Sequence, residues 1–110
     1  MIMKKNLLFI CTENRHRSPT AEKLFKNSDK YNAKSAGTSP LAKTKLTKKA
    51  LDWADMIFVM EDHHERQILK NFPKYSTKQI INLNVPDRFQ RDDLRLKRLL
   101  KERLKKWIDI

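Results

Sequence analysis

The sequence predicts a single α/β domain over residues 1–110, built as a four-stranded parallel sheet with helices on both faces. Four short apolar segments alternate with four amphipathic segments, which is the pattern of repeated strand–helix units. A chain of 110 residues supplies one hydrophobic core and no second one. Ligands of such folds bind beyond the carboxyl ends of the strands, so we look for chemistry in the loops that follow the apolar segments.

The first strand is expected at residues 7–10, whose sequence is Leu-Leu-Phe-Ile. A continuous apolar run of this kind is typical of a strand buried on both faces. Ser18 and Pro19 are expected to open the first helix, because serine is a good N-cap and proline fits the first turn. One face of that helix is apolar and is formed by Ala21, Leu24 and Phe25.

The remaining elements follow in the same alternation. Strands are expected at residues 31–36, 56–60 and 80–83, and helices at residues 43–53, 61–71 and 92–108. In the last helix, apolar residues recur at three- and four-residue spacing, which gives it one buried face. Residues 85–90, which include Pro86, are expected to form the loop before it.

Charge and composition limit the range of functions that the sequence allows. Basic residues outnumber acidic residues by 25 to 13, for a formal net charge of +12, which favours an anionic partner. No recognised nucleic-acid-binding motif accompanies the charge, so nucleic-acid binding is not predicted, although the charge alone leaves it open. No apolar stretch approaches the roughly 18 residues of a membrane span, and the run after Lys4 and Lys5 is too short for a secretory signal. We therefore expect a cytoplasmic protein with no membrane partner.

The loop after the first strand carries the clearest chemistry. It reads Cys11-Thr12-Glu13-Asn14-Arg15-His16-Arg17-Ser18-Pro19 and runs from a buried strand to a helix N-terminus. The N–H groups and partial positive charge of that helix end favour a thiolate at Cys11. Arg17 offers a planar fork for two phosphate oxygens, and Ser18 can form a hydrogen bond with the sulfur. This combination is suited to nucleophilic attack on a phosphate ester.

The order of these residues resembles the protein tyrosine phosphatase signature, C-x-x-x-x-x-R-S. It is most similar to the low-molecular-weight family, whose form C-x-x-N-x-x-R-S-P is matched at Asn14, Arg17, Ser18 and Pro19. The similarity continues at residues 35–38, which match the family's S-A-G-T, and at residues 55–60, where the family has its third strand. The resemblance implies that residues 12–18 form a phosphate-binding loop, that Asn14 holds its shape, and that Ser35 supports Asn14. We expect no metal and no cofactor.

The resemblance also implies a general acid, because the family uses an aspartate in a D-P-aromatic motif near its C-terminal strand. The corresponding loop here contains Pro86-Asp87-Arg88-Phe89, in which proline precedes the aspartate and the spacing to the aromatic residue is kept. We therefore assign Asp87 as the acid and Phe89 as the aromatic residue that contacts the substrate. Asp92 is the alternative acid, although Asp92 and Asp93 also suit the start of the last helix.

The chain departs from the family pattern in four places. Glu13 stands where the family usually has glycine, and its carboxylate would repel a phosphate unless it points away or pairs with Arg15. The chain is shorter after Gly37, which removes an aromatic rim, so we expect a more open mouth and weaker selection for phosphotyrosine. No supporting histidine occurs near Leu41. With a single cysteine in the chain, and His16 where some relatives have a second one, a disulfide within the loop is impossible.

These residues favour a cysteine-dependent phosphatase that hydrolyses phosphotyrosine or other aryl phosphate monoesters through a phosphocysteine intermediate. Its partner would be a phosphorylated substrate or a free oxyanion. One alternative is a non-catalytic phosphate- or anion-binding regulatory module on the same fold. Another is a phosphocarrier, which Arg17 disfavours because similarly folded sugar-transport components lack its equivalent. His63 and His64 are interpreted as surface residues on different sides of a helix.

Overall fold

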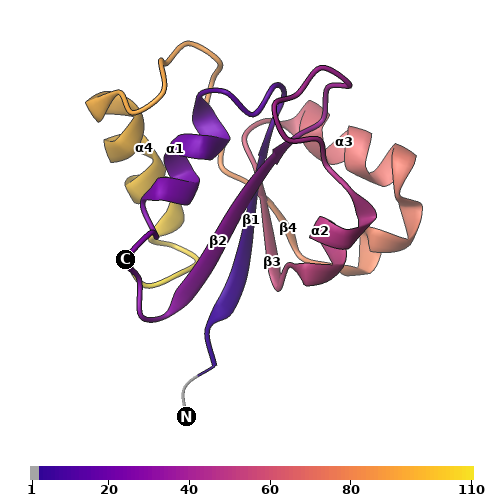
Figure 1. Ribbon diagram of the computed structural model, residues 1–110, viewed down its shortest axis with the longest axis horizontal. Helices are drawn as coiled ribbons and strands as arrows, with labels where there is room; N and C mark the ends of the chain where they lie inside the picture. Colours follow the sequence, from indigo (N-terminus) through magenta and orange to yellow (C-terminus); the bar gives the residue numbers. More distant parts are fainter. Residues whose placement is uncertain (1–2) are drawn as a thin grey trace.

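A parallel sheet of four strands forms the centre of the molecule in the computed structural model, which describes residues 3–110 (Figure 1). The strand order is β2-β1-β3-β4, so β1 pairs with both β2 and β3. The strands are β1 (Lys5–Cys11), β2 (Tyr31–Gly37), β3 (Met56–Val59) and β4 (Ile80–Asn82). All pairs are parallel, so the predicted fold class is confirmed.

Helices cover both faces of this sheet, as Figure 1 shows. One face carries α1 (Arg17–Lys23) and α4 (Leu94–Leu104). The other face carries α2 (Lys48–Trp53) and α3 (Asp62–Asn71), and the short 3-10 helix η1 (Pro73–Thr77) follows α3. None of the helices in residues 3–110 is long and apolar enough to cross a membrane.

The continuous apolar run of β1 is explained by burial on both sides. Leu7 and Phe9 belong to the core under α1 and α4, whereas Leu8 and Ile10 belong to the core under α2 and α3. Since strand side chains alternate between faces, Cys11 at the end of β1 lies on the α1 side with Leu7 and Phe9. The strand therefore delivers Cys11 to the start of α1.

Two helix starts differ from the sequence-based expectation. Ser18 is not the N-cap of α1, which begins at Arg17 after His16, because the Ser18 hydroxyl bonds to Asn14 and Cys11 instead. The second helix begins at Lys48 and not at residue 43, because the Thr47 hydroxyl caps it by accepting from the Ala50 N–H.

The last helix also starts later than residue 92. Asp93 is its N-cap and accepts a hydrogen bond from the Arg95 N–H at 2.8 Å, while Asp92 has a left-handed backbone with φ of 64°. The loop from β4 to α4 therefore extends through residue 93. This loop begins at the carboxyl end of β4, so it lies beside the loops that follow β1, β2 and β3. The candidate site is at this edge of the sheet.

Candidate active site

The loop after β1, residues 12–18, lies at one side of a cavity of about 470 Å³ at the carboxyl edge of the sheet. The cavity is lined by Cys11, Thr12, Glu13, Arg15, His16, Arg17, Asp87, Arg88, Phe89 and Gln90. The structure thus gathers residues from the β1–α1 loop and from the β4–α4 loop around a single opening. Residues that are 70 or more positions apart in the sequence can act there on one ligand.

Asn14 sets the shape of the 12–18 loop. Its backbone is left-handed, with φ of 57°, a conformation that asparagine tolerates better than most residues. Its buried side-chain amide donates to Ser18 Oγ at 2.8 Å and to Ser35 Oγ at 2.9 Å. Ser35 in turn donates to Glu22 Oε1 at 2.5 Å. The loop is therefore tied to β2 and to α1 through one amide.

The same network determines what Ser18 does. Because Ser18 Oγ accepts from Asn14, its own proton is free, and Cys11 Sγ lies 3.0 Å from Ser18 Oγ. Cys11 is a free cysteine with 3% of its surface exposed. The Ser18 hydroxyl can donate to a thiolate at this position, which stabilises the charged sulfur.

The backbone of the loop is available to an anion. Within residues 3–110, the N–H groups of residues 13–17 donate to no acceptor. Successive free N–H groups in such a loop form an anion-binding concavity. The structure therefore provides backbone donors next to the Cys11 sulfur.

The segment that follows β2 fixes the loop from outside. The N–H groups of Thr38, Ser39 and Lys43 donate to the carbonyls of Cys11, Thr12 and Glu13 at 3.0, 2.9 and 3.0 Å. Gly37 permits this approach, because a Cβ there would lie 2.5 Å from the Thr12 carbonyl oxygen. The Ser-Ala-Gly-Thr sequence thus contributes Ser35 to Asn14 and a close backbone contact at Gly37.

Arg17 is held under the cavity by two acceptors. Its side chain is 3% exposed, and its Nη1 donates to Glu61 Oε1 at 2.7 Å and to the Val85 carbonyl at 2.9 Å. Partial burial acts to raise the pKa of Glu61, but the hydrogen bond with His63 and the charge of Arg17 outweigh it and lower that pKa. Glu61, which orients the guanidinium of Arg17, is a site residue that the sequence did not predict.

His64 is not a surface residue, so that interpretation is wrong for it. Its side chain is fully buried, and Nδ1 accepts from the Glu61 N–H at 3.1 Å. The ring proton is therefore on Nε2, which lies 2.8 Å from Thr12 Oγ1 and donates to it. Burial lowers the pKa of His64 to about 3, and the charges of His63 and Arg17 act in the same direction. A neutral histidine thus positions the first residue of the loop.

The sequence did contain a signal that places Glu61 and His64 together at the start of α3. Glu61 and His64 have the N-cap and N3 spacing of a capping box directly after β3. His63, by contrast, is 43% exposed in its side chain and bonds to Glu61 Oε2 at 2.8 Å.

The two candidate acids lie in different places. Asp87 lines the cavity, with its side chain 66% exposed and its Oδ1 3.8 Å from Arg17 Nε. Asp92 is not among the cavity residues, and its Oδ2 pairs with Lys23 Nζ at 3.1 Å. Phe89 also lines the cavity, so Asp87 and the aromatic side chain share the same mouth.

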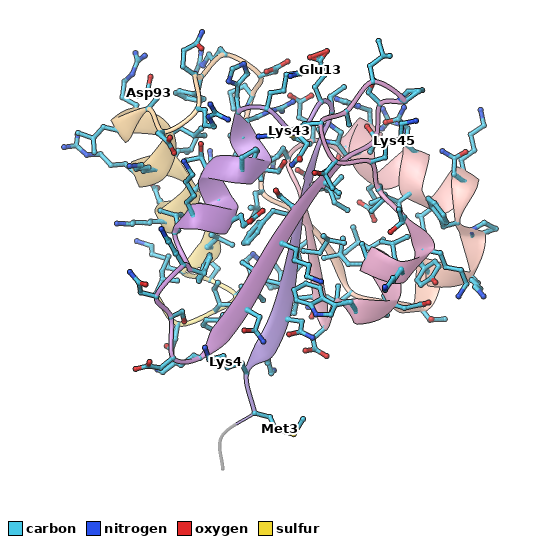
Figure 2. All side chains as sticks on the ribbon, viewed as in Figure 1. Met3, Lys4, Glu13, Lys43, Lys45 and Asp93 are labelled. Carbon is cyan, nitrogen blue, oxygen red and sulfur yellow. The ribbon has the colours of Figure 1, made fainter. Side chains whose placement is uncertain are left out.

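Glu13 stands at the outer rim of the loop, where Figure 2 shows its side chain at the edge of the molecule. It is exposed, and within residues 3–110 it forms no ion pair, with Arg15 or with any other base. Phe89 is the one Phe, Tyr or Trp residue of the described chain that lines the cavity.

Comparison with known proteins finds a family profile that matches the first part of the chain. Residues 6–50 match the sequence profile of the low molecular weight phosphotyrosine protein phosphatases. No curated protein sequence matches the chain significantly.

Solved structures match almost the whole chain. The tyrosine phosphatase Wzb from Escherichia coli K30, in complex with phosphate, is 26% identical, with a TM-score of 0.74 over 96% of both chains. Vibrio vulnificus Wzb, in complex with benzylphosphonate, is 20% identical, with a TM-score of 0.77 over 96% of this chain and 97% of that one. The YwlE arginine phosphatase from Geobacillus stearothermophilus is 22% identical, with a TM-score of 0.72 over 92% and 86%.

The profile match over residues 6–50 and the structural similarity to Wzb indicate a phosphatase of the phosphomonoesterase class. Residues 6–50 of the chain are similar to the low molecular weight phosphotyrosine protein phosphatase family, and almost the whole chain has the fold of the solved phosphatases.

Proposed function

We propose that this phosphatase hydrolyses phosphotyrosine or other aryl phosphate monoesters through a phosphocysteine intermediate on Cys11. The observation that carries the proposal is the 3.0 Å contact of Cys11 Sγ with Ser18 Oγ beside a cavity that Arg17 and Asp87 also line. A nucleophile, an oxyanion-binding group and a proton donor then act on one phosphoryl group.

In the first step, the Cys11 thiolate attacks phosphorus in line with the ester oxygen. An S–P bond forms while the P–O bond to the alcohol breaks, and Asp87 gives its proton to the departing oxygen. Arg17 and the free N–H groups of the 12–18 loop stabilise the charge on the three equatorial oxygens.

In the second step, water attacks the phosphocysteine. Asp87, now a carboxylate, accepts a proton from the water, and the S–P bond breaks with its electron pair returning to sulfur. The Ser18 hydroxyl donates to the sulfur and stabilises the thiolate as it leaves. The products are inorganic phosphate and the original enzyme.

Two further features support this assignment. Phe89 offers an aromatic surface at the mouth of the cavity, which suits an aryl ester. Cys11 is the free cysteine of the chain, and a reducing compartment such as the cytoplasm would keep it in the thiol state that the mechanism requires.

A non-catalytic anion-binding module is the second candidate, and Glu13 at the rim is the observation that favours it. A carboxylate close to a dianion weakens binding and catalysis, although solvent screens the exposed charge. In that case the loop would bind phosphate without turnover.

Turnover of p-nitrophenyl phosphate by the wild type and by Cys11→Ser separates the two candidates. The proposal expects hydrolysis by the wild type, and a loss of at least about 10³-fold in Cys11→Ser. Phosphate-dependent protection from thermal unfolding without any turnover would support the module instead. A phosphoarginine peptide belongs beside a phosphotyrosine peptide in the same assay, because YwlE is an arginine phosphatase, and we expect the phosphotyrosine peptide to be preferred.

A further inference from the structure

We propose that the preferred substrate is a phosphotyrosine peptide with acidic side chains next to the phosphorylated residue, which bind in a second, basic hollow. The inference rests on the proposed function and names its substrate class. The hollow has a volume of about 560 Å³ and is lined by Arg15, His16, Lys43, Gln90, Arg91 and Asp92. We call it the basic hollow.

The basic hollow adjoins the catalytic cavity. Arg15, His16 and Gln90 line both of them, so these residues form a shared wall. When the phosphate of a bound peptide reaches Cys11, the rest of the peptide must extend out of the cavity across its rim. Where it crosses the shared wall, the residues next to the phosphotyrosine enter the basic hollow.

The charges in the hollow are not compensated by the protein. Arg15, Lys43 and Arg91 are exposed, and within residues 3–110 none of them has a carboxylate within 4 Å. Asp92 is the acidic residue of the lining, and its carboxylate is already paired with Lys23 at 3.1 Å. Three cations therefore face the solvent around one concave surface, which attracts anions.

The backbone positions of these cations are fixed to the 12–18 loop. The Lys43 N–H donates to the Glu13 carbonyl at 3.0 Å, and the Arg91 N–H donates to His16 Nδ1 at 3.1 Å. Arg15 is part of the loop itself. Because His16 Nδ1 accepts a hydrogen bond, its proton is on Nε2, which adds a donor to the wall. The cations of the basic hollow are thus held at the catalytic loop.

An acidic peptide is the ligand that fits best. Exposed cations on long side chains each contribute little to binding, so a useful preference needs several anionic groups to meet several cations. A peptide with two or three carboxylates next to phosphotyrosine satisfies this need. Arg88, which lines the catalytic cavity, extends the positive surface toward the same substrate.

The chain offers a matched control in Lys45. It lies two positions after Lys43, and Figure 2 shows Lys43 beside α1 and Lys45 on the side of α3. Lys45 lines a separate hollow with residues of α3 such as Gln67 and Ile68. Lys43→Gln and Lys45→Gln therefore remove the same charge from opposite sides of one segment.

The test compares kcat/KM for two phosphotyrosine peptides that differ in having glutamate or alanine beside the phosphotyrosine. We expect the wild type and Lys45→Gln to prefer the acidic peptide by the same factor, mainly through KM. In Lys43→Gln that preference should fall by about 2–5-fold, with p-nitrophenyl phosphate turnover unchanged. High salt should reduce the wild-type preference as well.

Several results would overturn the inference. One is a wild type with no preference for the acidic peptide, and another is an equal loss of preference in Lys43→Gln and Lys45→Gln. A third is a Lys43-dependent preference confined to a small aryl bisphosphate, which would show that the basic hollow binds a second phosphate and not a peptide.

A binding measurement keeps this inference separate from the proposed function. Fluorescence anisotropy of the two labelled peptides with Cys11→Ser gives their Kd values without turnover. If the wild type hydrolyses nothing, the proposed function is wrong, and the Kd ratio still decides whether acidic side chains are recognised. An acidic-peptide preference that falls by about 2–5-fold in Cys11→Ser/Lys43→Gln supports the inference, and equal Kd values for the two peptides in Cys11→Ser contradict it.

Discussion

Mild acid should destabilise this protein through His64. The His64 side chain is buried and neutral, because it accepts from the Glu61 N–H and donates to Thr12 Oγ1. Its pKa in the folded protein is about 3, against an ordinary value of 6.5. Between these two pH values the unfolded chain binds a proton at His64 that the folded chain does not bind, so falling pH favours unfolding.

The magnitude follows from this linkage. One proton bound only in the unfolded state changes the free energy of unfolding by about 1.4 kcal/mol per pH unit. From about pH 7.5 down to about pH 5, His64 should therefore remove about 2 kcal/mol of stability. The pKa values of Glu61 and Asp93 are lowered, so the stability that these carboxylates contribute is lost at more acidic pH, below their ordinary values.

Urea denaturation followed by circular dichroism from about pH 7.5 to 5 measures the effect. His64→Gln is the informative variant, because glutamine at this N3 position can still form a capping box and does not titrate. We expect the free energy of unfolding of the wild type to fall with decreasing pH more steeply than that of His64→Gln. His63→Gln, which keeps the buried His64, is the control for a histidine-to-glutamine change and should still lose stability more steeply than His64→Gln. Equal slopes in the wild type and His64→Gln would refute the reasoning.

Three further variants test the site. Asp87→Asn should reduce kcat for phenyl phosphate by about 10²–10⁴-fold, and should reduce it less for p-nitrophenyl phosphate, whose leaving group hardly needs a proton. Equal losses on both substrates would contradict the role of Asp87 as the general acid. An inactive Asp92→Asn variant would assign that role to Asp92 instead. Gly37→Ala should lower stability by about 1–3 kcal/mol and weaken vanadate inhibition, since its Cβ would meet the Thr12 carbonyl at 2.5 Å; unchanged denaturation and inhibition would show that the contact is not needed. Glu13→Gly should raise kcat/KM by about 2–5-fold by removing an exposed repulsive charge, whereas a large loss of activity would show that Glu13 supports the loop.

Local features of the sequence predicted the fold well. The apolar run at residues 7–10 indicated a strand buried on both faces, and it lies at the centre of the sheet next to β2 and β3. Each strand could be predicted from the apolar residues of its own segment alone. The alternation of strands and helices then left few topologies, because parallel strands require crossover helices.

Residues whose environment depends on distant contacts were harder to predict. Ser18 has the right residue type for an N-cap, but the amide of Asn14 and the sulfur of Cys11 hold its hydroxyl elsewhere. His64 has a polar side chain, yet it is buried and hydrogen-bonded to Thr12, which is 52 positions away in the sequence. Glu61 reaches Arg17 over a similar separation of 44 positions.

Part of the candidate site could likewise be predicted from local sequence, and part of it could not. The order of residues in the 12–18 loop follows from local sequence, and the resemblance to a family pointed to Asp87 and Phe89, which do line the same cavity. The basic hollow could not be found from sequence, because its cations Arg15, Lys43 and Arg91 come from three separate segments. Their proximity is a product of the sheet order and of the loops packing on the 12–18 loop.

The central claim is that Cys11 carries the phosphoryl group during turnover. Mixing the enzyme with a ³²P-labelled aryl phosphate, followed by a rapid denaturing quench and peptide mapping, tests it directly. We predict label on the peptide that contains Cys11, and none when the same experiment uses Cys11→Ser. Turnover that continues in Cys11→Ser, with no label on Cys11 in the wild type, would contradict the claim.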